Sequence, residues 1–269
     1  MLTIALSLIG GVLAGFGLNA VWQGHPVWSV LAGLVVAILV MVVINLLMRK
    51  KLEAVFLKIQ DHIVNSQNAI RRKISTLGSH AGPTFQAKLE QEQAQAIREA
   101  IDMIDGVKPF EKWNFMVGRQ ADTLRAQFYF QIKDFEAADK YFKHALLLDP
   151  MLFAMQMTRC YKRGEQKEVD DLFQKGQARF KDDKAVLIYA LYSWILVQQN
   201  RIEDAIQVLV KAKTRAENDV LKQNWEHLVN GRVKRFSNSG LGDQWYALYL
   251  EQPRVQRIRE TPGKGFRRF

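Results

Sequence analysis

Residues 2–48 contain no Lys, Arg, Asp or Glu, and this uncharged stretch limits the possible folds more than any other part of the chain. It consists of two apolar runs, Leu2–Trp22 and Val27–Met48, separated by residues 23–26. A helix needs about 20 apolar residues to cross a hydrocarbon core of about 30 Å, so each run is long enough. The separating residues include Gly and Pro, which together favour a turn. The stretch therefore predicts a transmembrane helical hairpin over residues 1–48.

Small residues recur at a spacing of four in both runs, and residues so spaced lie on one face of a helix. They are Gly11 and Gly15 in the first run, and Gly33 and Ala37 in the second. Small side chains in membrane helices let two backbones approach closely. We expect these residues to pack the hairpin together within one chain, with a dimer through Gly11 and Gly15 as the alternative.

Basic residues set the expected orientation. Arg49, Lys50 and Lys51 follow the second run directly, whereas the turn carries neither Lys nor Arg. The positive-inside rule then predicts an integral protein of the cytoplasmic (inner) membrane with both termini in the cytoplasm. A cleaved signal peptide is not expected, because no basic segment precedes the first run and a second span follows at once. The single cysteine, Cys160, fits a reducing compartment.

The formal net charge of +11 lies in the part of the chain after residue 48. A basic segment beside a membrane suggests attraction to anionic lipid head groups, and nucleic acid is a second phosphate-bearing partner. The residues expected at the membrane surface are Arg49, Lys50, Lys51, Arg71, Arg72 and Lys73. The tail over 253–269 is rich in Arg and poor in apolar residues, which predicts disorder.

One helix is predicted from Arg49 to about Thr76, continuing the second span. Apolar or small residues alternate at spacings of four and three, as in a coiled-coil seam or the buried face of a packed helix. The seam consists of Leu52, Phe56, Ile59, Ile63, Ser66, Ile70 and Leu77. It could pack on the following domain, associate with a second copy, or lie on the membrane. A hinge at Ser79–Pro83 closes this segment (49–80), and leading helices over 81–118, including Phe85–Ile104, follow.

A helical repeat is visible in Ala121–Pro150. Ala138 and Ala145 permit close helix packing, Phe142 fills the groove between two helices, and Pro150 ends the second helix. This spacing resembles the tetratricopeptide repeat, a helix–turn–helix unit of about 34 residues.

Tyr129 matches the aromatic residue of that family's first helix, and Ala126 stands where a Gly is usual. Arg125 departs from the pattern, because its position is normally apolar.

The pattern recurs twice, in Gly164–Val169 followed by Phe173, and in Asn200–Ala205 followed by Leu209. Ala138, Val169 and Ala205 are equivalent in these copies and lie 31 and 36 residues apart. We expect repeats over 119–218 and capping helices over 219–252.

The first expected capping helix covers Asp219–Arg235. The second covers Gln244–Leu250, with Asp243 as its N-cap and with Trp245, Tyr246 and Tyr249 packed in the core.

The chain is therefore expected to be all-α, with the transmembrane hairpin followed by the α-solenoid of helix pairs that the resemblance implies. Stacked helix pairs form a concave groove that binds a peptide or a partner helix. The residues expected to line it are Gln127, Tyr129, Gln156, Arg159, Tyr189, Ser193 and Gln198. Tetratricopeptide proteins are known as scaffolds, so the resemblance implies a membrane-anchored adaptor for protein partners on the cytoplasmic side.

No catalytic, metal or cofactor site is predicted. The histidines are scattered without metal-ligand spacing, and no phosphate loop or nucleophile elbow occurs. We therefore do not expect an enzyme. An anionic-lipid or nucleic-acid binder acting through the basic linker and tail is the alternative function, with nucleic acid the less favoured partner.

Overall fold

The computed structural model describes residues 2–21, 26–77 and 83–253. Within these residues the chain is all-α, as predicted, and contains no strand. The chain divides into two compact units, Met1–Leu148 and Asp149–Phe269. Most of the expected inter-span turn, most of the expected hinge and the basic tail after Pro253 lie outside the described residues.

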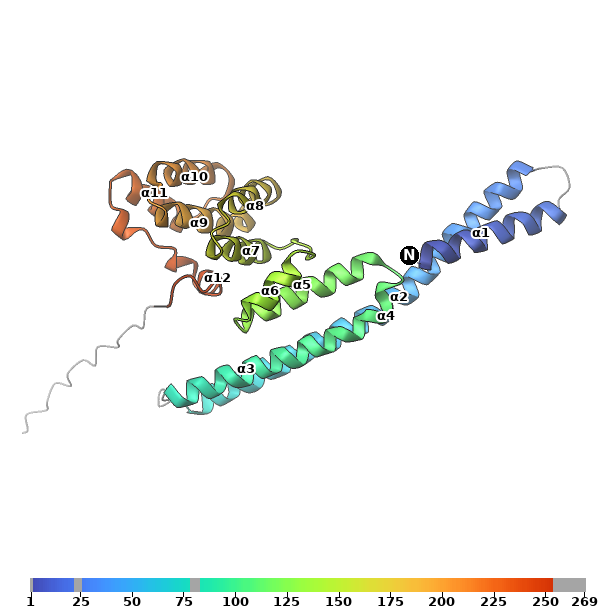
Figure 1. The fold of residues 1–269 in the computed structure, drawn as a ribbon, viewed down its shortest axis with the longest axis horizontal. Coiled ribbons are helices and arrows are strands. Elements are labelled where there is room, and N and C mark those ends of the chain that lie inside the picture. Colours follow the sequence, from blue (N-terminus) through green and yellow to red (C-terminus); the bar gives the residue numbers. More distant parts are fainter. Residues whose placement is uncertain (1, 22–25, 78–82, 254–269) are drawn as a thin grey trace, which may run out of the picture. The chain divides into compact units, whose positions relative to one another are not determined.

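The first unit begins with an antiparallel hairpin of α1 (Leu2–Val21) and α2 (Pro26–Leu77), seen in Figure 1. By length and composition, one helix among the described residues could cross a membrane, and it covers Val27–Thr76 within α2. Leu2–Gly17 in α1 is a shorter apolar helix. The two apolar runs of the sequence are therefore helical and packed on each other.

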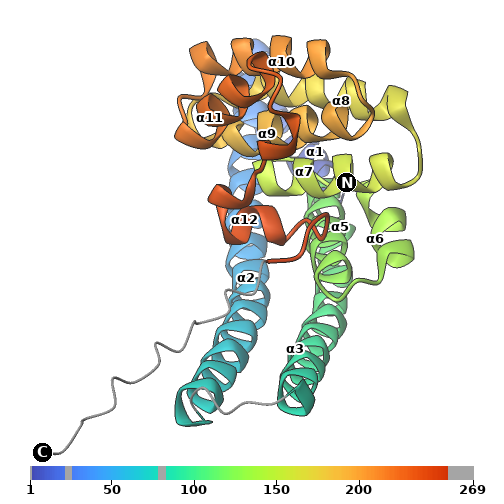
Figure 2. The same ribbon diagram turned by 90° about the vertical axis from the view of Figure 1, so that its left-hand side faces the viewer.

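The α2 helix continues without interruption beyond its apolar half and packs against α3 (Pro83–Ile104), as Figure 2 shows. Ile59 of α2 is 3% exposed and joins Ile97 and Ile104 of α3 in a common core. Leu52, Phe56 and Ile63 of the predicted seam pack on this core. The seam therefore faces the following helix of the same chain, which confirms the first of the three alternatives.

A helix pair completes the first unit. After the 3₁₀ turn η2 (Asp105–Val107) and α4 (Lys108–Glu111), the pair comprises α5 (Phe115–Gln131) and α6 (Phe135–Phe142). The side chain of Asn114 caps α5 by accepting the Met116 N–H at 2.9 Å. Val117, Ala121 and Phe128 of α5 are buried in the core that α2 and α3 share. The pair and the long hairpin thus have one continuous core.

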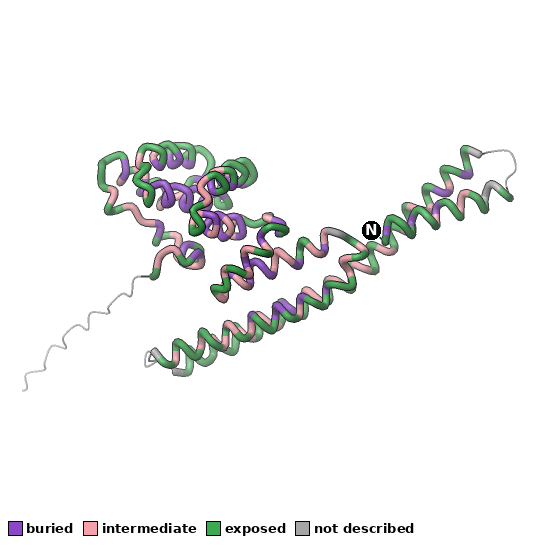
Figure 3. The backbone as a smooth tube through the Cα atoms, viewed as in Figure 1, coloured by how far each residue is buried: buried purple, intermediate pink, exposed green. Residues whose placement is uncertain are grey.

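The second unit is built around α9 (Asp183–Gln198), in which every residue from Ala185 to Leu196 is buried (Figure 3). The surrounding elements are α7 (Pro150–Lys162), α8 (Gln166–Arg179), α10 (Ile202–Arg215), α11 (Asp219–Val229), η3 (Val233–Arg235), η4 (Ser239–Leu241) and α12 (Asp243–Tyr246). A helix that is apolar on all sides needs neighbours on all sides.

The C-terminal elements differ from the expected capping helices. α11 ends at Val229, six residues before the predicted end. α12 spans only Asp243–Tyr246, and its N-cap is Gly242, so the prediction that Asp243 caps a longer helix is wrong. Positive φ angles at Gly242 (59°) and Tyr249 (54°) interrupt the helical path on either side. Trp245 is fully buried as expected, whereas Tyr249 is 39% exposed.

Candidate partner-binding surface

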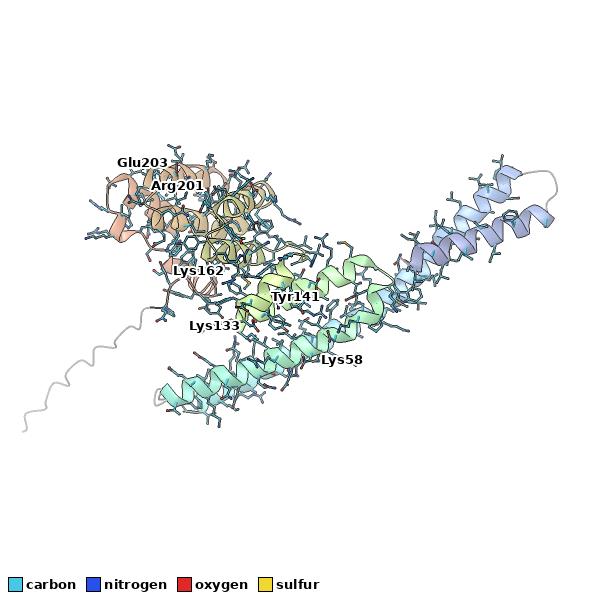
Figure 4. The ribbon with its side chains drawn as sticks, in the orientation of Figure 1. Lys58, Lys133, Tyr141, Lys162, Arg201 and Glu203 are labelled. Carbon is cyan, nitrogen blue, oxygen red and sulfur yellow. The ribbon has the colours of Figure 1, made fainter. Side chains whose placement is uncertain are left out.

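The same turn ends the first helix of each pair. One residue has a positive φ, and the N–H of the next residue donates to the carbonyl five positions earlier, a usual way to end a helix. The positive-φ residues are Lys133 (62°), Gly164 (77°), Asn200 (59°) and Gly231 (67°). The bonds run from Asp134 to Tyr129, Glu165 to Cys160, Arg201 to Leu196 and Arg232 to His227, at 2.7–3.0 Å. Figure 4 labels Lys133 and Arg201 in two of these turns.

These turns lie 31, 36 and 31 residues apart, at positions 133, 164, 200 and 231. The pairs α5/α6, α7/α8 and α9/α10 therefore share one local geometry, although their spacing is uneven. The fourth turn shows that α11 ends as the first helix of a further pair would end. No regular second helix follows it, because only the short η3 lies between Gly231 and η4.

The contacts of Arg125 explain why a charged residue stands at a normally apolar position of the repeat. Its guanidinium is buried, with the residue 7% exposed, and donates to Asp105 at 2.8 Å and to Asp122 at 3.2 Å. The guanidinium carbon also lies 5.6 Å from the centre of the Tyr141 ring. Asp105 belongs to η2, so the pair of charges fixes α5 to the segment that follows α3. A buried charge is tolerated only when it is paired, and here two carboxylates pair it.

Comparison with known proteins identifies this helix pair. Residues 123–150 match the tetratricopeptide repeat. The matched residues run from Thr123 in α5 through α6 to Pro150, at the start of α7. The chain matches no curated protein and no solved structure.

The surface of the matched repeat carries a stacked pair of tyrosines. The rings of Tyr129 (α5) and Tyr141 (α6) are 5.6 Å apart and nearly parallel, and both side chains are half-buried. Burial raises the pKa of Tyr129 above its ordinary value of 10.0, so its hydroxyl is neutral at physiological pH. Neutral phenols present an apolar face and a hydroxyl, which suits them to protein interfaces. Gln127, also predicted to line a groove, is half-buried on α5.

In the second unit the chain's own C-terminal segment, residues 236–251, packs on α9. Asn238 is fully buried, donates to the Ala190 carbonyl at 2.9 Å and accepts from Asn224 at 2.8 Å. Two indoles, those of Trp194 on α9 and Trp245 on α12, donate to the carboxylate of Glu251 at 2.7 and 2.9 Å. This segment thus occupies a face of α9 that an open solenoid would leave for a partner.

Two of the predicted groove residues do not line an open groove. Tyr189 and Ser193 have no exposed surface, so neither lines an open groove. The Tyr189 ring packs edge-on against Phe173 at 5.6 Å, and the Ser193 hydroxyl donates to the Ala190 carbonyl at 3.1 Å. Of the remaining predicted residues, Gln156 and Arg159 on α7 are half-buried, and Gln198 at the end of α9 is exposed.

The structure brings the four small residues of the hairpin together. A Cβ added to Gly11 would lie 2.7 Å from the Ala37 Cβ, and one added to Gly33 would lie 2.6 Å from the Gly11 carbonyl oxygen. A Cβ at Gly15 would lie 3.3 Å from the Ser29 carbonyl oxygen. The helices therefore meet at backbone distance, and these glycines face the partner helix within the same chain.

The six basic residues expected at a membrane surface form two separate groups. Arg49–Lys51 directly follow the apolar part of α2, whereas Arg71–Lys73 lie near its end. A rise of 1.5 Å per residue puts Arg71 about 33 Å from Arg49 along the helix. Lys73 also forms an ion pair with Glu92 at 2.6 Å. A helix that crosses a bilayer steeply therefore cannot hold both groups at one level.

A cluster of Cys160, Glu165 and Glu168 has the composition of a metal site, and its ligand atoms lie within 4.8 Å of one another. Arg163 already bonds two members of this cluster, and the Cys160 thiol donates to the third, Glu168, at 3.6 Å. Arg163 donates to both oxygens of Glu165, at 2.8 and 2.5 Å, and to the Cys160 sulfur at 3.5 Å. Burial raises the pKa of the Cys160 thiol to about 12, which keeps the sulfur protonated. A guanidinium and a neutral thiol disfavour a cation at this position.

Proposed function

We propose that the chain is a membrane-anchored scaffold that binds a protein partner through its helix pairs on the cytoplasmic side. The observation that carries the proposal is the tetratricopeptide repeat at residues 123–150, since such a repeat indicates protein–protein interaction. No catalytic role is part of the proposal.

Membrane anchoring is supported by the surface of the hairpin. Leu13, Phe16 and Val30 are 67%, 75% and 67% exposed, and apolar neighbours surround them along both helices. Proteins in water rarely expose apolar patches larger than a few hundred Å². A hydrocarbon environment removes this cost, because lipid tails solvate apolar side chains.

The orientation is supported by the antiparallel hairpin and by the charges after it. Gly11 faces Ala37 and Gly15 faces Ser29, so the helices are antiparallel, and the start of α1 lies at the Arg49–Lys51 end of the apolar part of α2 (Figure 1). Basic residues beside a span favour the cytoplasmic side. The helix pairs would then lie in the cytoplasm.

The tyrosine pair on α5/α6 is the surface that we propose for the partner. It belongs to the matched repeat, both rings are partly accessible, and it lies next to the buried Arg125. In the second unit, by contrast, residues 236–251 cover part of α9.

A photo-crosslinking residue at Tyr141 of the full chain, expressed in intact membranes, tests the surface. Lys88 on α3, which is exposed and lies outside the repeat, provides the matched control. We expect a discrete crosslinked protein from position 141 that is absent from position 88. A chain lacking Leu2–Met48 should give less of it, because the anchor raises the effective concentration at the membrane. Identical products from both positions, or none from 141, would overturn the assignment.

Anchoring and orientation have their own tests. Release of the full chain from membranes by alkaline carbonate would overturn the anchor. Trimming of the Arg-rich C-terminal end by protease added outside sealed cells would overturn the orientation.

A further inference from the structure

The segment Lys108–Asn114, here called the collar loop, lies against the start of α1. The Leu2 N–H donates to the Lys112 carbonyl at 3.0 Å, and the Thr3 hydroxyl donates to the Trp113 carbonyl at 2.9 Å. The first N–H groups of a helix have no partner within the helix, so the loop supplies one. Thr3 is only 6% exposed. These contacts fix the collar loop at the level where the uncharged stretch of the chain begins.

The second helix of the hairpin, α2, places the collar loop at the same height along the hairpin. On α2 the uncharged stretch ends at Met48, and Arg49 follows. Further along α2, Gly106 of η2 lies beside Val55, since a Cβ added there would be 3.7 Å from the Val55 side chain. The chain therefore runs from the level of Val55 at Gly106 to the level of Leu2 at Lys112. If the apolar helices cross a bilayer, this path crosses the layer of lipid head groups.

The side chains of the collar loop have the chemistry of that layer. Lys108 and Lys112 are exposed, and Phe110 and Trp113 are half-exposed. Aromatic rings, Trp above all, are enriched at the boundary between membrane and water. Lysines near the surface gain from anionic lipids. Glu111 is the only acidic residue within the loop, and Lys108 forms an exposed ion pair at 2.7 Å with Asp105, three residues earlier in η2.

We propose that the collar loop is a second membrane contact, in which Phe110 and Trp113 enter the interface and the lysines bind anionic lipid head groups. This proposal rests on the proposed membrane anchor, whose apolar helices set the level of the bilayer. The contact would fix the position of the first helix pair relative to the bilayer, because α5 begins directly after the loop, at Phe115. The matched repeat, which starts at Thr123, would then begin about 12 Å along α5 from this contact.

The test uses the full chain in vesicles of phosphatidylcholine, with and without phosphatidylglycerol. Cys160 is replaced by Ser, and an environment-sensitive fluorophore is attached through P109C, because Pro109 is exposed and this change keeps both lysines of the collar loop. Lys88 is the matched control site, because it is exposed and lies near Glu92, which pairs with Lys73 at the distant end of α2. Quenching by a nitroxide on the lipid head group is compared with quenching by iodide in the water.

We expect the fluorophore at 109 to be quenched by the head-group nitroxide and shielded at least threefold from iodide relative to position 88. Shielding should increase when phosphatidylglycerol is present. Equal iodide quenching at 109 and 88, in a chain that resists alkaline carbonate, would overturn the collar contact and leave the anchor standing. Equal shielding in both lipids would overturn the role of anionic head groups. Release by carbonate would overturn the anchor and the collar contact together.

Discussion

Replacing Glu251 by Gln should loosen the C-terminal segment from α9. The carboxylate accepts one hydrogen bond from Trp194 and one from Trp245, at 2.7 and 2.9 Å. A glutamine keeps one acceptor oxygen and turns its N–H₂ group toward the other indole N–H. Trp245 is fully buried and Trp194 is 7% exposed, so the indole left without an acceptor has little access to water.

The magnitude follows from these contacts. A hydrogen bond to a charged group contributes about 1.5–3 kcal/mol, and a buried donor without a partner costs about 1–3 kcal/mol. Glu251 itself is partly exposed, which favours the lower end of the range. We expect the free energy of local opening of residues 236–251 to fall by about 2 kcal/mol, which corresponds to about a 30-fold larger open population.

Amide hydrogen exchange on the full chain in nanodiscs measures this opening. The Ala247 N–H donates to Asp243 and the Leu248 N–H to Trp245, so both amides report on the segment. They should exchange about 30-fold faster in E251Q, in line with the opening free energy. Gln252→Ala changes the exposed neighbouring residue and should leave both rates unchanged.

Two results would refute the reasoning. Rates for Ala247 and Leu248 within threefold of the unmodified chain would show that the carboxylate does not hold the segment. An equal acceleration at the Tyr189 amide, in the buried middle of α9, would show that the whole unit opens.

Three further predictions concern the rest of the chain. Gly33→Ala should lower the free energy of unfolding of the hairpin in mixed micelles by about 1–3 kcal/mol, because the new methyl would lie 2.6 Å from the Gly11 carbonyl oxygen. Gly17→Ala is the control and should not lower this free energy, because the space around Gly17 is open. Hydrogen bonds, first from Lys108 and then from Arg125, hold the pKa of Asp105 below its ordinary 3.8, so the ionised carboxylate stabilises the fold above pH 3.8. Asp105→Asn should therefore lower the free energy of unfolding at neutral pH. Chemical denaturation at several pH values should show this loss shrinking as the pH falls through the lowered pKa. Cys160, whose pKa burial raises to about 12, should react with iodoacetamide at pH 7 only in denaturant, and rapid labelling of the folded chain would contradict its burial.

The spacing of apolar residues within one segment was sufficient to predict the helices that pack through a regular apolar face. The seam containing Phe56 and Ile59 has the spacing of a packed helix, and it packs on α3. Ala138 and Phe142 predicted the second helix of the first pair, and both are buried in α6. The predicted end at Pro150 is wrong, because α6 ends at Phe142 and Pro150 begins α7. In these cases the periodicity of one segment decides which face is buried.

The partners of Arg125 could not be predicted in this way. Asp105 lies 20 residues earlier, beyond the start of α5, and no spacing rule connects the two residues. A charged residue at a normally apolar position was the available signal, since such a charge requires a partner when buried. The identity of that partner depends on the tertiary fold.

The misplaced groove residues have a related cause. Tyr189 and Ser193 occupy first-helix positions that can face a partner in a stack of open repeats. Here Tyr189 is buried against Phe173 of α8, and Ser193 is buried with its hydroxyl bonded to the Ala190 carbonyl of its own helix. The chain also returns through Asn238 and Trp245 and packs on α9. The sequence after α11 has no repeat pattern, so the sequence alone could not predict that this segment packs on the earlier helix α9.

The continuity of α2 determines how the proposed anchor and the matched repeat work together. Between Leu34 and Leu77 the helix contains neither Gly nor Pro, so it has no usual site for a kink. Ile59, the α2 residue buried in the core shared with α3 and α5, lies about 15 Å along the axis from Arg49. Arg125 fixes α5 to the end of α3 through Asp105, and α3 packs along α2. The matched helix pair is therefore joined to the apolar hairpin through packed helices, and a partner bound there would be held in a fixed orientation as well as near the membrane.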